Sequence, residues 1–198
     1  MEIRSFNKHE IVQVVSIHKK AFNDFFLTQL GDKFLWLYYY TVSKNNKGIL
    51  IGYYEDDNLL GFSCATTLSR GFYKALIIEN SIKYGIFGIK LIFTKPCSLL
   101  RILKNFSKSN KSINDDGNYA ELLSVGVDPG IQGSGIGKQL LSELEKQLAE
   151  KEIKQLSLTT DYYKNDKAIG FYKSLGYEIM YEFVTYPNRK MYRLIKDL

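Results

Sequence analysis

Three glycines at alternate positions, Gly133, Gly135 and Gly137, constrain this chain most, because they lie in a loop between a predicted strand and a predicted helix. Residues 120–127 upstream are apolar and end in β-branched side chains, which is typical of a buried strand. Residues 137–151 downstream carry leucines at helical spacing, which predicts an amphipathic helix. The glycines let a ligand approach the main chain closely. The unpaired N–H groups of the first helical turn and the helix dipole then favour an anion.

Two common phosphate-binding loops do not fit these residues. A Walker A loop has a glycine five positions before its Gly-Lys pair and a serine or threonine after it, but Gln132 and Gln139 occupy these positions. A dinucleotide-binding fingerprint has a third glycine where Lys138 stands, and it follows a strand near the N-terminus. The pattern that remains is Gln-x-x-Gly-x-Gly, after a strand that ends in Val-x-Val-x-Pro.

This pattern resembles the acyl-CoA-binding motif of the GNAT N-acetyltransferase superfamily, and a second motif of that family follows it. Together the two motifs cover about 118 to 180, in the family's order and spacing. The resemblance implies an α/β fold of the α+β type, with a splayed, mixed, mostly antiparallel sheet flanked by helices. The second motif, Asn-x-x-Ala-x-x-Phe-Tyr-x-x-x-Gly-Phe, is matched by Asn165, Ala168, Phe171, Tyr172, Leu175, Gly176 and Tyr177, the last in place of the usual phenylalanine.

The resemblance also implies acetyl-CoA as co-substrate and assigns its contacts. The strand edge at Val125, Gly126 and Val127 is expected to pair with the pantetheine arm, and Asn165 to bond the same arm. Gly126 is expected to mark a bulge that splays the sheet. An amide of this strand end would polarise the thioester carbonyl. The pyrophosphate is expected against the loop amides and the Lys138 cation, over Gln132, Gly133, Ser134, Gly135, Ile136, Gly137 and Lys138.

Tyr172 is the candidate general acid. A helix that starts near Asn165 places both residues on one face, and the resemblance implies that the Tyr172 hydroxyl protonates the departing thiolate. A phenol with a pKa near ~10 stays protonated at neutral pH and serves as a donor. The alternative is a tyrosine that only packs in the core.

The general base is less well defined by the sequence. An alkyl amine with a pKa near ~10.4 is mostly protonated at pH 7, so its deprotonation needs assistance. Glu121, near the start of the fourth strand, is the first candidate, directly or through water, and a surface carboxylate is the alternative. Asp161 and Asp128 are further candidates. Protein-N-terminus acetylases of this superfamily often have Glu where this chain has Thr160, which counts against that subclass.

The length of 198 residues and the 45% hydrophobic content predict a single domain over residues 1–198. No basic-then-apolar leader opens the sequence, and two cysteines are too few for a disulfide framework, so a cytoplasmic protein is expected. The periodicity predicts strands at 2–6, 48–55, 58–67, 119–127, 153–160, 177–185 and 190–196, and helices at 8–22, 31–44, 135–151 and 165–175, with a helical insertion at about 69–112 between the third and fourth strands.

The net charge of +6 is concentrated in that insertion. Residues 69–112 hold nine lysines or arginines and one acid, Glu79, so this segment carries +8 and the remainder −2. A general nucleic-acid role is therefore not indicated. Glu79, Lys83 and Lys90 interrupt the apolar run from 75 to 93, which argues against a transmembrane segment.

An amphipathic helical pair with a basic rim is expected in the insertion. Three roles are possible for this pair. It is expected to cap the acceptor groove and attract a phosphorylated substrate, to form a homodimer contact, or to lie on an anionic membrane surface. The cap is the favoured reading, because apolar faces of enzymes more often meet protein than lipid.

Two other groups of side chains were considered as binding residues. His9 and His18 lie in the first helix without a cysteine or carboxylate cluster, so they are interpreted as surface residues and no metal site is expected. The aromatic run 34–40 is interpreted mainly as core, with a substrate pocket as the alternative for Tyr38 to Tyr40. Phe25 and Phe26 carry the same ambiguity.

The leading hypothesis is an acyltransferase that moves an acetyl group from acetyl-CoA to a primary amine of a small molecule. An amino sugar on a nucleotide or lipid carrier is the favoured acceptor, because the acceptor side is enlarged, basic and aromatic. The alternatives are acetylation of a protein or peptide amine, with the insertion as docking surface, and an acyl-CoA-binding regulatory module without turnover.

Overall fold

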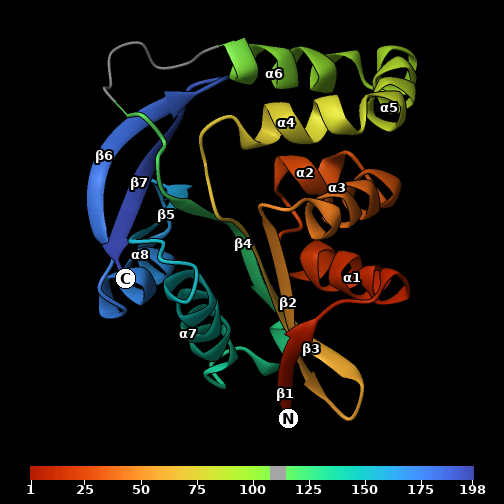
Figure 1. The fold of residues 1–198 in the computed structure, drawn as a ribbon. Coiled ribbons are helices and arrows are strands. Elements are labelled where there is room, and N and C mark those ends of the chain that lie inside the picture. Colours follow the sequence, from red (N-terminus) through yellow and green to blue (C-terminus); the bar gives the residue numbers. More distant parts are fainter. Residues whose placement is uncertain (108–114) are drawn as a thin grey trace.

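The computed structural model describes residues 1–107 and 115–198. Figure 1 shows a sheet with helices on both sides. The elements run in the order β1 (Glu2–Ser5), η1 (Lys8–Glu10), α1 (Ile11–Ala21), α2 (Phe26–Gln29), α3 (Asp32–Lys44), β2 (Gly48–Glu55), β3 (Asn58–Thr66), α4 (Phe72–Glu79), α5 (Ser81–Thr94), α6 (Pro96–Ser107), β4 (Ala120–Val127), η2 (Pro129–Ile131), α7 (Ile136–Ala149), β5 (Gln155–Asp161), α8 (Asp166–Ser174), β6 (Glu178–Thr185) and β7 (Arg189–Asp197).

One seven-stranded sheet holds the fold together, in the order β1-β2-β3-β4-β5-β7-β6. Every neighbouring pair is antiparallel except β4 and β5, which are parallel. The β4–β5 pairing is short and ends at Leu122 opposite Leu158, whereas β4 continues along β3 to Val127. The sheet therefore splits between β4 and β5, which confirms the splayed, mostly antiparallel sheet expected from the sequence.

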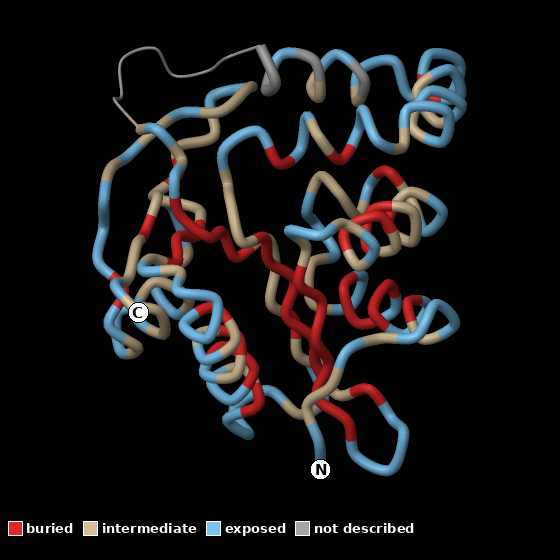
Figure 2. Tube along the Cα trace, in the orientation of Figure 1, coloured by how far each residue is buried: buried red, intermediate tan, exposed pale blue. Residues whose placement is uncertain are grey.

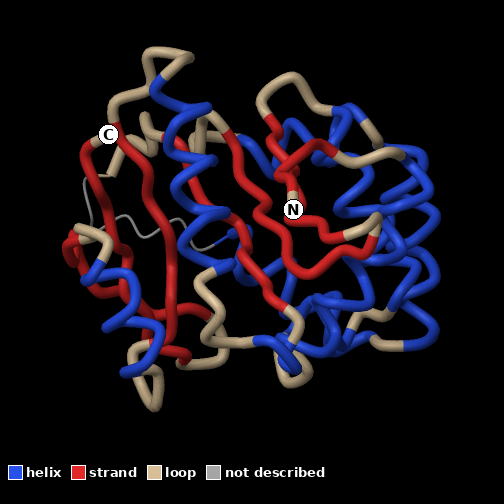
Figure 3. Tube along the Cα trace, turned by 90° about the horizontal axis from the view of Figure 1, so that it is seen from below, coloured by secondary structure: helices blue, strands red, loops and turns tan. Residues whose placement is uncertain are grey.

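The two faces of the sheet carry different helices. Helices α1 and α3 pack on one face and α7 on the other (Figure 1). Figure 2 shows the buried residues along β2, β3 and β4 and on the inward sides of these helices. Each face has its own apolar core: Leu35 and Phe62 belong to the first, and Leu140 and Leu156 to the second, all four fully buried. Seen from below, the strands separate beside α7 (Figure 3).

The connection between β2 and β3 is a tight hairpin. Asp56 and Asp57 form its turn with φ of 47° and 63°, and Glu55 pairs with Asn58. The prediction of a bulge at Gly126 is wrong, because Gly126 pairs regularly with Phe62. The register shift between Cys64 and Ala65 instead leaves out Leu123 of β4. Gly126 instead leaves room for a ring: a Cβ there would lie 2.8 Å from Cε1 of Phe62.

The predicted insertion is helical, but it forms three helices and not a pair. Asn80, with φ −118° and ψ 31°, separates α4 from α5, and a break at Lys95-Pro96, where proline cannot continue the preceding helix, separates α5 from α6. The three helices lie over α2 and α3 (Figure 1). The last part of the predicted insertion, 108–112 with its two lysines, falls outside the described residues.

The described residues include neither a membrane-spanning helix nor a metal-binding group. No helix there combines the length and the apolar character needed to cross a bilayer. The same residues contain no group of three or more histidine, cysteine, aspartate or glutamate side chains placed to hold a metal ion.

Candidate active site

A cavity of about 320 Å³ opens where β4 and β5 separate. It is lined from the two sides of the split and from the first helix. The residues that matter for chemistry there are His18 of α1, Ser124 and Val125 of β4, Thr160 of β5, Asn165 just before α8, and Tyr172 within α8. The fold thus brings the second sequence motif, which begins at Asn165, to the edge of β4, the strand that leads into the glycine loop.

The glycine loop continues from that strand and ends at the N-terminus of α7. Gly133 and Gly135 adopt φ of 88° and 83°, a left-handed backbone that favours glycine. Helix α7 begins at Ile136 with no side chain capping it. The amides of Ile136, Gly137 and Lys138 meet no acceptor among the residues that the structure describes. These orphaned donors at the end of a 14-residue helix form an anion cradle.

The free edge of β4 links the cavity to this cradle. Between Leu123 and Val127 the strand pairs with β3 on one side only, because its pairing with β5 has ended. Exposed strand edges bind extended, amide-bearing ligands by adding a strand. Gly137 lies beside both motifs: a Cβ there would make ordinary van der Waals contact with Phe171 at 3.6 Å and with Val127 at 3.8 Å. Gln132, Ser134 and Lys138 surround the loop and are exposed.

Tyr172 and Asn165 lie together in the cavity, as the sequence predicted. Burial raises the pKa of Tyr172 to about 12, so its hydroxyl is protonated throughout the neutral range. Its ring packs edge-on against Tyr177, 5.7 Å between centroids. Asn165 donates from Nδ2 to the Thr160 hydroxyl at 2.5 Å, which fixes its amide at the start of α8.

Glu121 does not line this cavity. Its buried carboxylate accepts a hydrogen bond from the Ser69 hydroxyl at 2.5 Å and pairs with Arg193 at 3.2 Å. Arg193 also lies 3.7 Å from Asp115. Ser69 follows β3 and Asp115 precedes β4, so this buried cluster ties both ends of the insertion to the sheet.

The other two carboxylates considered as bases are also paired. Asp161 lines the cavity, where the guanidinium of Arg189 binds it with two nitrogens. Asp128 lies at the far end of β4 and accepts a hydrogen bond from Lys20 at 2.7 Å. The Lys20 ammonium, together with the Gly130 amide, lowers the pKa of Asp128 below its ordinary value.

His18 is a cavity residue that the sequence interpretation placed on the surface, and this interpretation was wrong. Its side chain is buried, with 3% of the residue exposed, while His9 is exposed as expected. The missed signal is its helical spacing: Ile11, Val14 and His18 lie on the same inward face of α1. Its Nδ1 lies 2.6 Å from the Tyr39 hydroxyl, which in turn lies 3.0 Å from the Ser124 hydroxyl.

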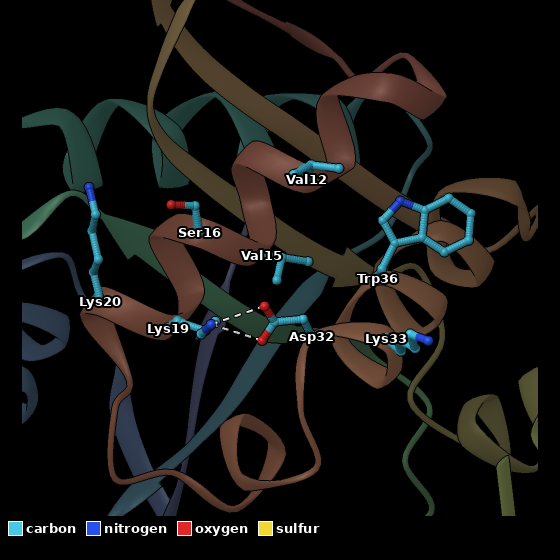
Figure 4. A pocket seen from close by; sticks show the side chains of 8 residues that line it. All are labelled: Val12, Val15, Ser16, Lys19, Lys20, Asp32, Lys33 and Trp36. Carbon is cyan, nitrogen blue, oxygen red and sulfur yellow. Dashed lines mark hydrogen bonds and ion pairs between the residues drawn. The ribbon is translucent and has the colours of Figure 1, made fainter.

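A larger hollow of about 580 Å³ lies between α1 and α3 (Figure 4). Lys19 and Asp32 form an ion pair across it, 2.9 Å apart, and Trp36 lies on its far side (Figure 4). None of the residues of the two sequence motifs lines this hollow. The candidate active site is therefore the smaller cavity at the split of the sheet.

Known proteins resemble this chain in sequence and in fold. The sequence profile of the acetyltransferase (GNAT) family matches residues 11–177. A protein described as probable acetyltransferase TAP2, from Glycine max, is 33% identical over 118 residues, which cover 58% of this chain and 45% of that protein. The match thus spans less than half the length of this relative.

Solved structures share the whole fold at low identity. The structure of ribosomal-protein-alanine N-acetyltransferase from Brucella melitensis superposes with a TM-score of 0.65 at 16% identity, covering 100% of each chain. An aminoglycoside 6'-N-acetyltransferase complexed with coenzyme A gives a TM-score of 0.60 at 17% identity, covering 100% of this chain and 97% of that one. With the family match over most of its length, the chain belongs to the GNAT acetyltransferase family.

Proposed function

We propose that this protein transfers an acetyl group from acetyl-CoA to a primary amine of a small molecule. One observation carries the proposal: the unpaired edge of β4 runs from the cavity that holds Tyr172 to the uncapped N-terminus of α7. A thioester with a long amide-bearing arm and a pyrophosphate fits such a path, and it supplies the activated acetyl group.

The residues along this path would hold the co-substrate. The amides of Ile136, Gly137 and Lys138 would bind the pyrophosphate, because they are orphaned donors at a helix N-terminus. The backbone of Val125 to Val127 would pair with the arm. Asn165 lines the same cavity and would bond the arm from the other side of the split.

Two proton transfers complete the reaction. The amine must lose a proton, and the departing thiolate must gain one. Tyr172 would donate, since its hydroxyl is protonated and binds no other described residue. Glu121 remains the proposed base, acting through water: it lies one residue before the β4–β5 pairing ends, at the apex of the split.

The mouth of the cavity supports an anionic acceptor, such as an amino sugar on a nucleotide or lipid carrier. Arg189 lines the cavity, and its Cζ lies 5.3 Å from the centre of the Phe25 ring. Arg101 of α6 lies 4.4 Å from the centre of the neighbouring Phe26 ring, and its Nε is buried without a partner in the described structure. Burial, and then the charge of Arg189, lowers the pKa of Arg101. Two guanidinium groups with one carboxylate, Asp161, favour a phosphate or carboxylate on the acceptor.

The relatives' names include both kinds of acceptor. One structural neighbour is an aminoglycoside acetyltransferase and another acts on a ribosomal-protein alanine. Thr160 stands where protein-N-terminus acetylases of the superfamily often have Glu, which supports the small-molecule acceptor. The peptide amine remains the alternative acceptor.

The outer face of α5 supports peripheral contact with an anionic membrane. At ~100° per residue, Ile82, Ile86, Ile89 and Phe93 fall within an arc of about 60°. They are 79%, 67%, 59% and 82% exposed. Lys83 and Lys90 lie together along one side of this stripe, and no acidic residue occurs between 80 and 107. Such a surface complements anionic lipid, whereas a homodimer through it would oppose two basic surfaces.

We propose that residues 1–198 form one domain, with the insertion anchored at the Glu121–Arg193 cluster, and that the protein acts in the cytoplasm. Cys64 and Cys97 are both free thiols, which is in keeping with a reducing compartment.

Release of free thiol on mixing the protein with acetyl-CoA and a panel of amines tests the function. Amino sugars with and without a phosphate, and short peptides, form the panel. Turnover of an amine supports the proposal, and turnover of peptides alone favours the alternative acceptor. Tight binding of acetyl-CoA without turnover of any amine would make the protein a regulatory acyl-CoA-binding module.

Charge reversal of Lys83, Lys90 and Arg101 to glutamate separates two roles of the insertion. A raised acceptor KM with unchanged acetyl-CoA affinity supports a cap that attracts a phosphorylated acceptor. Loss of flotation with phosphatidylglycerol vesicles, with an unchanged acceptor KM, supports a membrane contact.

A further inference from the structure

Another cavity, of about 500 Å³ and called the apolar cavity below, lies between the insertion and the helices beneath it. Its floor comes from α2 and α3, and its roof from α4, α5 and α6. The lining is apolar except for the hydroxyl groups of Tyr38, Tyr73 and Tyr84, and that of Tyr84 is bonded to the Thr41 hydroxyl at 2.7 Å. A cavity of this size falls within the usual ~300–1,000 Å³ of small-molecule sites.

This apolar cavity adjoins the cavity of the candidate active site, called the transfer cavity from here on, through three consecutive residues. Phe25 lines the transfer cavity, Phe26 lines the apolar cavity, and Leu27 lines both. A ligand that contacts Leu27 in the transfer cavity is therefore separated from the apolar cavity by that side chain. The arginines beside Phe25 and Phe26 lie at the same junction.

We infer that the apolar cavity binds a hydrocarbon chain carried by the acceptor, beyond the group that bears the amine. The inference rests on the proposed function and names the acceptor more closely: an amine linked to an alkyl or isoprenoid chain. Apart from the tyrosine hydroxyls, the described lining offers no polar side chain to a sugar, a nucleotide base or a peptide backbone. Each methylene moved from water into such a cavity strengthens binding by roughly threefold to fourfold.

The exposed stripe on α5 is consistent with this ligand. Helix α5 presents Tyr84, Phe87 and Leu91 inward to the cavity, and its isoleucines point outward. One of the three helices that roof the cavity, α5, therefore has an outer face that is apolar and basic. A chain held by a lipid carrier would reach the cavity from that side of the protein.

Two glycines of α5 provide a matched pair of variants. Gly88 lines the cavity, and a Cβ at this position would meet no heavy atom within 4 Å. Gly85 also has open space within 4 Å, but it does not line the cavity and is exposed. Gly88→Leu fills the cavity and Gly85→Leu does not. Both changes favour the helix equally, so neither is expected to unfold the protein.

The first measurement is the binding of 11-(dansylamino)undecanoic acid, followed by its fluorescence. We expect wild type and Gly85→Leu to bind it with equal affinity and Gly88→Leu to bind it at least about 10-fold more weakly. Equal affinity in all three proteins, or equal loss in both variants, would overturn the inference. Circular dichroism on each variant confirms folding.

The second measurement uses methyl, butyl and octyl glycosides of glucosamine as acceptors. We expect kcat/KM to rise with chain length in wild type and Gly85→Leu, and to be independent of chain length in Gly88→Leu. Acetylation of all three glycosides at one rate by wild type would overturn the inference and leave the proposed function standing. A different outcome is that no amine is acetylated, while the dansyl probe still binds and Gly88→Leu weakens its binding. That outcome would overturn the proposed function and leave a hydrocarbon site.

Discussion

The Nδ1 atom of His18 lies 2.6 Å from the hydroxyl oxygen of Tyr39, and both side chains are buried. The other ring nitrogen, Nε2, is buried without a partner among the described residues. Burial lowers the pKa of His18 from its ordinary value of 6.5 to about 4. His18 is therefore neutral at pH 7, and it lines the transfer cavity as an uncharged hydrogen-bonding group.

We expect the free energy of unfolding to fall between pH 6.5 and pH 4.5 because of His18. In this range the unfolded chain binds a proton at His18 that the folded protein does not, so stability is complete above pH 6.5 and falls on acidification. The full loss on reaching pH 4 is up to about 3 kcal/mol. Urea unfolding at several pH values measures it. His18→Gln should be less stable at pH 7 but should lack this pH dependence; an equally steep loss in that variant would assign the effect elsewhere.

Gly135→Glu should abolish binding of acetyl-CoA. The change places bulk and a negative charge at the N-terminus of α7, where the pyrophosphate is proposed to bind. Gly135→Gln is the matched control, because it imposes the same bulk and the same strain at φ 83° without the charge. Calorimetry should find residual binding in the glutamine variant only. Wild-type affinity in a folded Gly135→Glu protein would exclude the loop from the binding site.

Tyr172→Phe should lower turnover by about 10²-fold and leave the affinity for acetyl-CoA unchanged, since it removes a proton donor and keeps the ring. Pre-steady-state measurement of the chemical step, together with calorimetry, separates the two effects. Tyr177→Phe is a useful control, because the Tyr177 hydroxyl is engaged by Glu145 at 3.1 Å. If Tyr172→Phe retains the wild-type rate of chemistry, Tyr172 is a packing residue.

Glu121→Gln tests the proposed base against a structural role. As a base, Glu121 should contribute a limb of the pH–rate profile that the variant loses. As an anchor, it should matter for stability, because the variant leaves the buried Arg193 without this counter-charge and should cost about 3 kcal/mol. Ser69→Ala removes one hydrogen bond from the same carboxylate and keeps its charge. An unchanged pH–rate profile with a large loss of stability would assign Glu121 to the anchor alone.

The sequence by itself determined the elements and the two motifs. Alternating and helical periodicities placed the strands and most helices within about two residues, because half-buried elements repeat their apolar residues with a fixed period. The glycines at 133 and 135 predicted the loop, since only glycine adopts positive φ there at low cost. Short helix α2 was missed, as a four-residue helix has no period to read.

Tertiary structure decided which of these residues meet. Glu121 was the first candidate for the base, yet it pairs with Arg193 of β7, 72 positions away, whereas Tyr172 lines the cavity. Helical spacing places His18 on the inward face of α1, but only the packing of α1 in the fold brings that face to the cavity. The apolar cavity at Leu27 exists only because α2 and the insertion converge. Such contacts join residues far apart in the chain, and their geometry depends on how whole elements pack, which no local pattern of the sequence encodes.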